Sequence, residues 1–326
     1  MAHELNFFTD GRARMAYVGA EPWHGLGQQL TEGAPLEVWA KESGMDYEIL
    51  GSPVGYTTVD GKTYPYEKKQ VLYRKDNGDA LSVVGKNYKV VQPIEVLEFF
   101  KNLTVDYGFQ LETAGVLFNG QKYWALARTG ETAKIAKKDE MRGYVLLATS
   151  CDGSLKTTAR HTSIRVVCNN TLELSARNRG SEVKVSHSSV FKAETVQTEL
   201  GILEGGWNGF IESAQELAKV KITDKQAVDF VIKLMGDPSK PVEGQSRITD
   251  ISKVLQLYKG QGRGADMVSA NDTAWGIVNA VTEWGDYHKG KDQQRRLEYT
   301  WFYDVAQLKR KAFDMAVNDF VYQQAA

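Results

Sequence analysis

The amino-acid sequence predicts an α+β protein in which an N-terminal arm and hairpin precede a helix–antiparallel meander–helix core and a helical C-terminal region. Three observations predict this order. Gly and Pro are frequent up to residue 65, strand-like runs alternate with turn signals as far as residue 192, and helical periodicity dominates from residue 193. The expected regions are therefore an irregular arm (1–65), a basic α+β core (66–192) and a helical region (193–326). At 326 residues and 42% hydrophobic content, the chain can bury a substantial core.

The first elements are the irregular arm and the hairpin. Aromatic residues alternate with Gly and Pro in stretches such as EPWHGLGQQL, and one short helix is expected near Pro35–Ser43, where Pro35 suits a first turn. Within residues 69–91, the run QVLYR meets the turn DNGD and returns as ALSVV. That pattern is typical of a β-hairpin.

The core begins with a helix from Pro93 to Gly108, because Pro favours the first turn, apolar residues follow at helical spacing and Gly favours a stop. Three strand-like runs follow within residues 109–154, and we expect them to form an antiparallel meander. The signals that separate or end them are Asn119–Gly120, a lysine-rich loop at Thr129–Glu140, and Asp152–Gly153.

The stretch TSCDGSLKTTARHTSIRVVCNNTL (Thr149–Leu172) closes the core and contains both cysteines. A helix from about Thr157 would place Ile164, Val167 and Cys168 on one apolar face. The density of β-branched residues in TSIRVVC is also compatible with a strand. The helix is the preferred interpretation, and the strand is the alternative.

From residue 193 onward, several stretches have the periodicity of amphipathic helices, including TDKQAVDFVIKLMG and NDTAWGIVNAVTEWGDYHKG. Residues suited to begin these helices are Asp224, Thr249 and Asp272, and residues suited to end them are Gly236 and Gly260. The sequence therefore predicts a mainly helical C-terminal region.

The charge is unevenly distributed although the formal net charge is only −1. Residues 1–60 contain three basic and nine acidic side chains, a net of −6, whereas residues 120–192 contain thirteen basic and six acidic ones, a net of +7. A localised basic region of this kind favours an anionic partner. The alternative is a solvated face with scattered charges.

The basic region is also rich in Ser, Thr and Asn, which bind phosphate oxygens alongside Lys and Arg. It predicts a nucleic-acid-binding surface made of Lys122, Arg128, Lys137, Lys138, Arg142, Lys156, Arg160, Arg165, Asn169 and Arg177. Tyr123, Trp124 and Tyr144 lie among these residues and are candidates for base stacking, with Trp124 better explained as core.

Other kinds of site are less well supported. Cys168 and His161 resemble a nucleophile and a base, but Cys168 falls on the predicted apolar face. The spacing of Cys and His does not fit a compact zinc site, and the chain has no G-x-x-x-x-G-K-[ST] motif, so neither a metal nor another cofactor is expected. No catalytic residue is assigned. An enzyme using Cys168 or Asp152, a nuclease or a Cys-dependent hydrolase, is the alternative, and a non-enzymatic host-interaction protein is another.

Three stretches, EPWHGLG, TSCDGSLKTTARHTSIRVVCNNTL and NDTAWGIVNAVTEWGDYH, resemble the phage/plasmid-like protein family, a domain of unknown function. This resemblance implies a mobile-element setting. The expected order of elements is also similar to that of the Rad-type single-strand annealing proteins, whose subunits form rings or filaments and hold single-stranded DNA in a basic groove. The matching pieces would be Pro93–Gly108, Phe109–Ser154 and Thr157–Asn178.

These inferences give one hypothesis: ATP-independent binding and annealing of single-stranded DNA in phage or plasmid recombination or replication. The partners expected are single-stranded DNA and further copies of the chain, arranged head to tail by the acidic arm and the basic core. No membrane segment is predicted, and the host cytoplasm is the expected location. On this hypothesis Arg165 lies on the surface, so Arg165→Ala should change stability by no more than about 1 kcal/mol.

Overall fold

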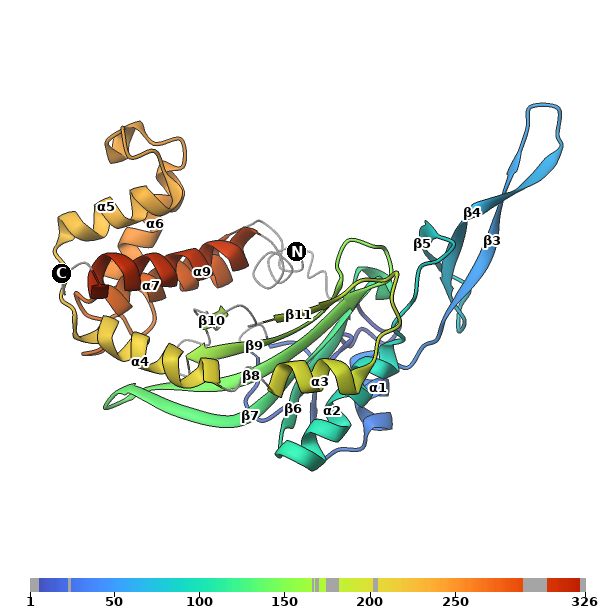
Figure 1. Ribbon diagram of the computed structural model, residues 1–326, viewed down its shortest axis with the longest axis horizontal. Coiled ribbons are helices and arrows are strands. Elements are labelled where there is room, and N and C mark those ends of the chain that lie inside the picture. Colours follow the sequence, from blue (N-terminus) through green and yellow to red (C-terminus); the bar gives the residue numbers. More distant parts are fainter. Residues whose placement is uncertain are drawn as a thin grey trace. The chain divides into compact units, whose positions relative to one another are not determined.

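The computed structural model describes residues 6–22, 25–165, 167, 170–173, 182–201, 205–289 and 304–322. The chain forms two compact units (Figure 1). Unit 1 consists of Met1–Gly130, Val145–Arg160 and Glu182–Gly201, and unit 2 of Glu131–Tyr144, His161–Ser181 and Ile202–Ala326. The three consecutive regions expected from the sequence divide the chain differently, and their boundaries stay a prediction.

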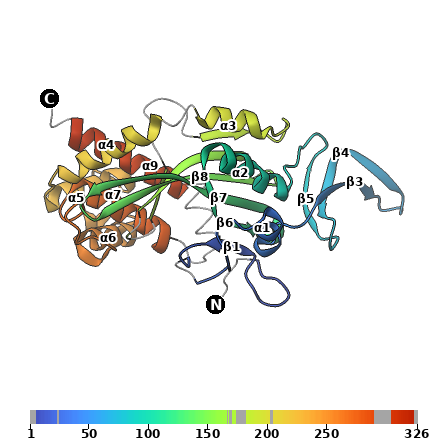
Figure 2. The same ribbon diagram turned by 90° about the horizontal axis from the view of Figure 1, so that it is seen from below.

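The larger sheet has the strand order β10-β9-β8-β7-β6-β1-β2, with β11 also paired to β9. Figure 2 shows β6, β7 and β8 side by side. The strands are β1 (Met15–Val18), β2 (Gln28–Leu30), β6 (Gln110–Leu117), β7 (Lys122–Ala136), β8 (Asp139–Ser150), β9 (Thr157–Arg165), β10 (Asn170–Glu173) and β11 (Glu182–Val185). The predicted antiparallel meander is therefore present as β6, β7 and β8.

Unit 1 packs helices α1 (Leu36–Ser43), α2 (Pro93–Tyr107) and α3 (Ala193–Gly201) with its part of this sheet. Helix α2 begins and ends as predicted: the Glu95 carboxylate in its first turn accepts a 2.6 Å hydrogen bond from the amide of the N-cap residue Gln92, and Gly108 follows the helix with φ 70°. The Gln92 side chain also exchanges two hydrogen bonds of 2.9 Å with the backbone of Ile49. This contact attaches the start of α2 to Ile49, the first residue of a second sheet.

The second sheet belongs to unit 1 and has the order β3-β4-β5, formed by β3 (Ile49–Thr57), β4 (Thr63–Arg74) and β5 (Ala80–Gly85). Strands β4 and β5 are the hairpin expected from QVLYR and ALSVV. Strand β4 continues well beyond that hairpin and pairs with β3, so part of the predicted irregular arm is β-structure. The strands β1 and β2 also lie in that arm, and Met15 and Ala16 of β1 are buried in the larger sheet.

The predicted helix from Thr157 is wrong, because Thr157–Arg165 is strand β9. All but one of its nine residues are buried, so the strand lacks the alternation of exposed and buried positions that usually indicates a strand. Its buried hydroxyl groups are used within the fold, as in the 2.8 Å hydrogen bond between Thr149 and Thr157. The β-branched residues therefore decide the structure here, as the strand alternative anticipated.

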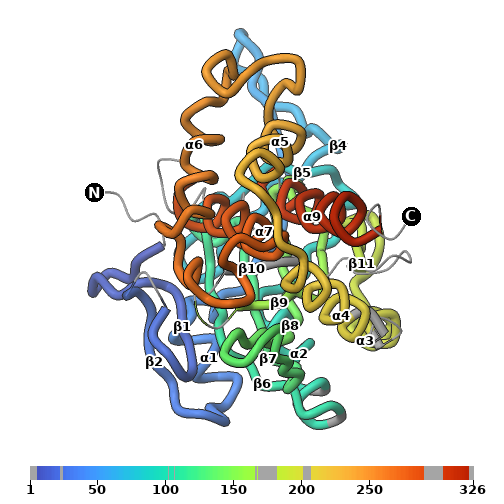
Figure 3. Tube along the Cα trace, turned by 90° about the vertical axis from the view of Figure 1, so that its left-hand side faces the viewer, coloured from blue at the N-terminus to red at the C-terminus, as the bar shows by residue number. Residues whose placement is uncertain are grey.

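The predicted helical C-terminal region is present, and apart from α3, which lies in unit 1, its described helices lie in unit 2 (Figure 3). Those in unit 2 are α4 (Gly205–Lys219), α5 (Asp224–Met235), α6 (Ile248–Gln256), α7 (Ala274–Glu283) and α9 (Asp304–Ala316). Leu257–Gln261, Trp284–His288 and Val317–Tyr322 are π-helical turns that continue α6, α7 and α9. Two short 3₁₀ turns, Phe118–Gly120 in unit 1 and Val242–Gly244 in unit 2, complete the described elements.

Helix α7 is the centre of unit 2, since every one of its residues is buried and it contacts α4, α6 and α9. Most of its residues are apolar, and its buried polar side chains Asn279, Thr282 and Glu283 take part in hydrogen bonds. Thr273 caps it by accepting a 3.0 Å hydrogen bond from the Gly276 amide, and Thr223 caps α5. The expected caps Asp272 and Asp224 thus lie one residue away from the observed ones. None of the helices in the described part of the chain has the length and apolarity needed to cross a lipid bilayer.

Candidate nucleic-acid interface

The eight described cations that were predicted to bind nucleic acid fall into three groups by burial. Lys137, Lys138 and Lys156 are exposed, Arg128 and Arg142 are half-buried, and Lys122, Arg160 and Arg165 are buried. Asn169 and Arg177 lie outside the described residues. Burial therefore separates side chains that a dissolved anion can reach from those that it cannot.

The exposed group in unit 2 lies at the turn between β7 and β8, where Lys137 and Lys138 connect the two strands. Strand β7 continues to Ala136 and shortens the predicted lysine-rich loop to these two residues. Lys134 is also exposed, while the neighbouring Ile135 is buried in the core of unit 2, as expected for successive residues of a strand. We call Lys134, Lys137 and Lys138 the turn lysines. None of the three has an ion-pair partner within the described ranges.

The two half-buried arginines already donate hydrogen bonds to acceptors within the protein. In unit 1, the Arg128 guanidinium donates to Gln110 Oε1 at 2.5 Å and lies 3.9 Å from a Glu112 carboxylate oxygen. In unit 2, Arg142 Nε donates to Glu140 at 3.0 Å. An anionic ligand would have to compete with these partners, whereas the turn lysines present their full charge.

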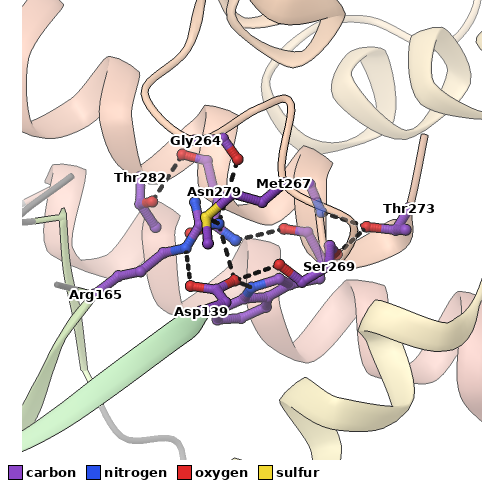
Figure 4. A network of polar contacts seen from close by, with 10 residues as sticks. Asp139, Arg165, Gly264, Met267, Ser269, Thr273, Asn279 and Thr282 are labelled. Atoms are coloured by element: carbon purple, nitrogen blue, oxygen red, sulfur yellow. Dashed lines mark hydrogen bonds and ion pairs between the residues drawn. The ribbon is translucent and has the colours of Figure 1, made fainter. Parts of the chain in front are cut away.

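Arg165 lies in a buried polar network of unit 2 (Figure 4). Its side chain is 1% exposed and forms a bidentate pair with Asp139, with Nε–Oδ1 and Nη2–Oδ2 distances of 2.7 and 2.9 Å. Asp139 Oδ2 also accepts hydrogen bonds from the Ser269 hydroxyl at 2.6 Å and from the Trp275 indole at 3.1 Å. The carboxylate is therefore surrounded by donors that offset the cost of its burial.

The same network holds the loop that precedes α7. Arg165 Nη2 contacts the Gly264 carbonyl and the Met267 sulfur, both at 3.4 Å, from one side of the loop. The Thr273 hydroxyl donates to the Ser269 carbonyl at 2.6 Å. The packing is close, since a Cβ on Gly276 would lie 1.9 Å from the Ala270 carbonyl oxygen. Loop, helix α7 and the ends of β8 and β9 therefore form one packed cluster.

Glu283 provides a further attachment of this loop. Its carboxylate accepts a 2.8 Å hydrogen bond from the Arg263 amide, and its side chain is buried. Burial raises the pKa of Glu283 above its ordinary value, and the Arg263 amide and guanidinium act against that rise. The Glu283 carboxylate thus attaches the start of this loop to the end of α7.

The cysteine and histidine positions do not form a reactive site among the described residues. Cys151 is fully buried, and burial, together with the nearby Asp152, raises the pKa of its thiol to about 12. His161 is buried in β9, and its proposed partner Cys168 lies outside the described residues. No group of three or more His, Cys, Asp or Glu side chains suited to a metal ion occurs in the described part of the chain.

Asp152, the other residue considered for catalysis, forms hydrogen bonds within its own turn. Its Oδ1 atom accepts hydrogen bonds from the amide and the hydroxyl of Ser154, at 2.9 and 2.6 Å. Burial acts to raise the pKa of Asp152, but these hydrogen bonds outweigh it and hold the pKa below its ordinary value. The carboxylate is thus ionised and engaged with its own turn.

The aromatic residues predicted to lie among the cations are all core residues. Tyr123, Trp124 and Tyr144 are each no more than 2% exposed, so their rings are not available for stacking on a base. Exposed aromatic rings occur elsewhere, at Tyr56 and Tyr64 of the β3–β4 hairpin. They were not predicted, because GSPVGYTTVDGKTYPY has the Gly and Pro content of an irregular arm. The alternation of Thr and Tyr around the DG turn was the available signal.

We predict that Arg165→Ala destabilises the protein by about 3–5 kcal/mol, because it leaves the Asp139 carboxylate buried without its counter-charge. This reverses the expectation of a surface position. The measurement is urea unfolding followed by far-UV circular dichroism, with Lys156→Ala as the control at an exposed cation. An Arg165→Ala midpoint equal to that of the control would contradict the structural role of the pair.

A second prediction concerns Cys151, whose thiolate fraction at pH 8 should be roughly one in ten thousand for a pKa of about 12. Iodoacetamide should label this residue slowly in the native protein and rapidly in urea, as followed by peptide mass spectrometry. Labelling in the native protein as fast as in urea would show that the thiol is exposed and ionised.

Comparison with known proteins gives a family but no function. The model of a family described as a domain of unknown function (DUF932) matches residues 80–303, which is more than half of the chain. No curated protein and no solved structure matches it. The chain therefore belongs to the DUF932 family.

Proposed function

We propose that the protein binds single-stranded DNA without ATP and promotes the annealing of complementary strands. The observation that carries the proposal is the group of turn lysines, which are exposed at one end of β7 and β8 without a carboxylate partner in the described ranges. Lysines in this state attract phosphates and release the counterions that surround them. Lys156, exposed in unit 1, is a further candidate contact.

Fewer features support nucleic-acid binding in the structure than the sequence predicted. The hydroxyl groups of Thr157, Thr158 and Ser163 are buried, so they support the fold and do not face a phosphate backbone. The similarity to Rad-type annealing proteins relied on a helix from Thr157 that is a strand. Exposed charge, and not topology, therefore supports the proposal.

A mechanism that follows from lysines alone is electrostatic. The ammonium groups hold the sugar–phosphate backbone and leave the bases accessible for pairing. Few phosphates are neutralised by one chain, so stable binding of a long strand requires several copies side by side. We therefore propose a homo-oligomer, a ring or filament, acting in phage or plasmid recombination or replication in the host cytoplasm.

The structure reduces the charge that the arm can offer to a head-to-tail contact with the core of another copy. Several arm carboxylates already have partners within unit 1, as in the pairs of Asp10 and Glu42 with Arg12 and of Glu48 with Lys75. A chain beginning near Pro65 would also lack β1, whose residues are buried in the larger sheet, so that truncation does not test assembly alone.

We predict that the double variant Lys137→Ala/Lys138→Ala weakens binding of a fluorescent oligothymidylate and lowers its salt dependence. The slope of log Kobs against log salt should fall by about 0.7 for each phosphate that is no longer neutralised, or roughly 1.4 for the two lysines together. Fluorescence anisotropy over a salt series measures both quantities. Thermal stability should not change, because both side chains are exposed.

The matched control is Lys225→Ala/Lys240→Ala, which removes the same charge from exposed positions elsewhere in unit 2. The control should bind like the wild type apart from a small general charge effect. Equal losses in the two double variants would show that net charge, and not the turn, sets the affinity. Absence of binding by the wild type at low salt would remove the proposed function.

A further inference from the structure

The β3–β4 hairpin of unit 1 extends away from the larger sheet of that unit (Figure 1). The pairing of β3 with β4 is irregular between Pro53 and Gly55, and beyond this point Gly55–Thr57 pairs with Thr63–Pro65. Strand β5 pairs only with the root of β4, at Lys69–Tyr73. The outer part therefore has open edges and exposed faces. We call residues 54–69 the tyrosine hairpin.

Three tyrosines of this hairpin have exposed rings. Tyr56 and Tyr64 are directly opposite each other in the register, and their rings stack with centroids 5.7 Å apart and an interplanar angle of 29°. Tyr56 is 52% exposed, Tyr64 42% and Tyr66 43%. Aromatic rings of this size are normally placed where something covers them. In the described part of unit 1, nothing does.

Contacts at the tip and at the root of the hairpin order the backbone from which these rings project. At its tip, the Thr58 amide donates to the Lys62 carbonyl at 2.9 Å, and the hydroxyls of Thr57 and Thr63 are 3.1 Å apart across the strands. At its root, Gln92 binds Ile49, and the buried Arg74 guanidinium lies 3.9 Å from the centre of the Tyr47 ring. Rings held in this way lose little conformational freedom when a ligand stacks on them.

The charges near the rings favour an anionic partner. Residues 54–69 contain the exposed lysines Lys62, Lys68 and Lys69 and two carboxylates, of which Asp60 is 3.0 Å from the Lys62 ammonium. Lysines are depleted at the centre of protein–protein interfaces, whereas three of them lie beside these rings. Addition of a partner strand is opposed by Pro53 and Pro65, which lack an amide hydrogen.

We propose that the tyrosine hairpin is a base-stacking platform for single-stranded nucleic acid. Exposed aromatic rings stack on unpaired bases of any sequence, and neighbouring lysines neutralise the phosphates between them. This inference rests on the proposed function and adds to it a second contact, in which the rings contribute stacking and the lysines contribute the salt-dependent part. The hairpin lies before residue 80, outside the part of the chain that matches the family.

The test compares two double variants of the full-length protein, Tyr56→Leu/Tyr64→Leu and Tyr56→Phe/Tyr64→Phe. Leucine keeps an apolar side chain but cannot stack on a base, whereas phenylalanine keeps the stacking ring. With a labelled oligothymidylate, the Leu variant should bind about tenfold or more weakly, and the Phe variant should bind within about twofold of the wild type. The salt slope should be the same for all three proteins. An oligouridylate of equal length shows whether the platform distinguishes DNA from RNA.

The outcomes separate this inference from the proposed function. Binding by the Leu variant equal to that of the wild type would overturn the platform and leave the turn lysines in place. No binding by the wild type would remove both. If the Leu variant loses self-association in sedimentation and a short oligothymidylate still binds normally, the hairpin is a contact between subunits and the inference is wrong. Far-UV circular dichroism of the Leu and Phe variants verifies that both are folded.

Discussion

The buried ion pair between Asp139 and Arg165 is the interaction on which the arrangement of unit 2 depends. Two charges removed from water are stable only when nearly every donor and acceptor finds a partner. Ser269 and Trp275 supply the remaining donors to the carboxylate. Arg165 Nη2 also contacts the Gly264 carbonyl, in the loop that precedes α7. The pair therefore fixes where β8 begins, where β9 ends and how the loop meets α7. Each of these contacts lies within unit 2.

The difference between guanidinium and ammonium groups accounts for the burial of Arg165 and the exposure of the turn lysines, although Lys122 of the same region is buried as well. The planar guanidinium of Arg165 fits a carboxylate in a bidentate manner and tolerates burial, whereas an ammonium group keeps its hydration best at the surface. The turn lysines are exposed in accordance with that difference. The high local charge of the sequence is thus partly structural, and only the exposed part is available to a partner. The proposed electrostatic contact in unit 2 and the stacking contact in unit 1 are independent physical contributions.

Local signals in the sequence predicted the elements that local interactions determine. Helix α2 follows from Pro93 and Gly108, and the β4–β5 hairpin from its DNGD turn. Strand β9 was not predictable in the same way, because burial on both faces removes the alternation of a strand and its spacing also fits a helix. The buried polar network around Asp139 was also not predictable. Asp139 is separated by 26 residues from Arg165 and by 130 from Ser269, and no periodicity connects positions so far apart.

The most direct test of the central claim is a double-mutant cycle on Asp139→Asn and Arg165→Met, measured by urea unfolding. If the two side chains stabilise unit 2 as a pair, each single variant loses stability and the double variant loses less than the sum. The coupling free energy should be about 1–3 kcal/mol. Additive losses, with a coupling free energy near zero, would contradict the account, because each side chain would then act independently of the other.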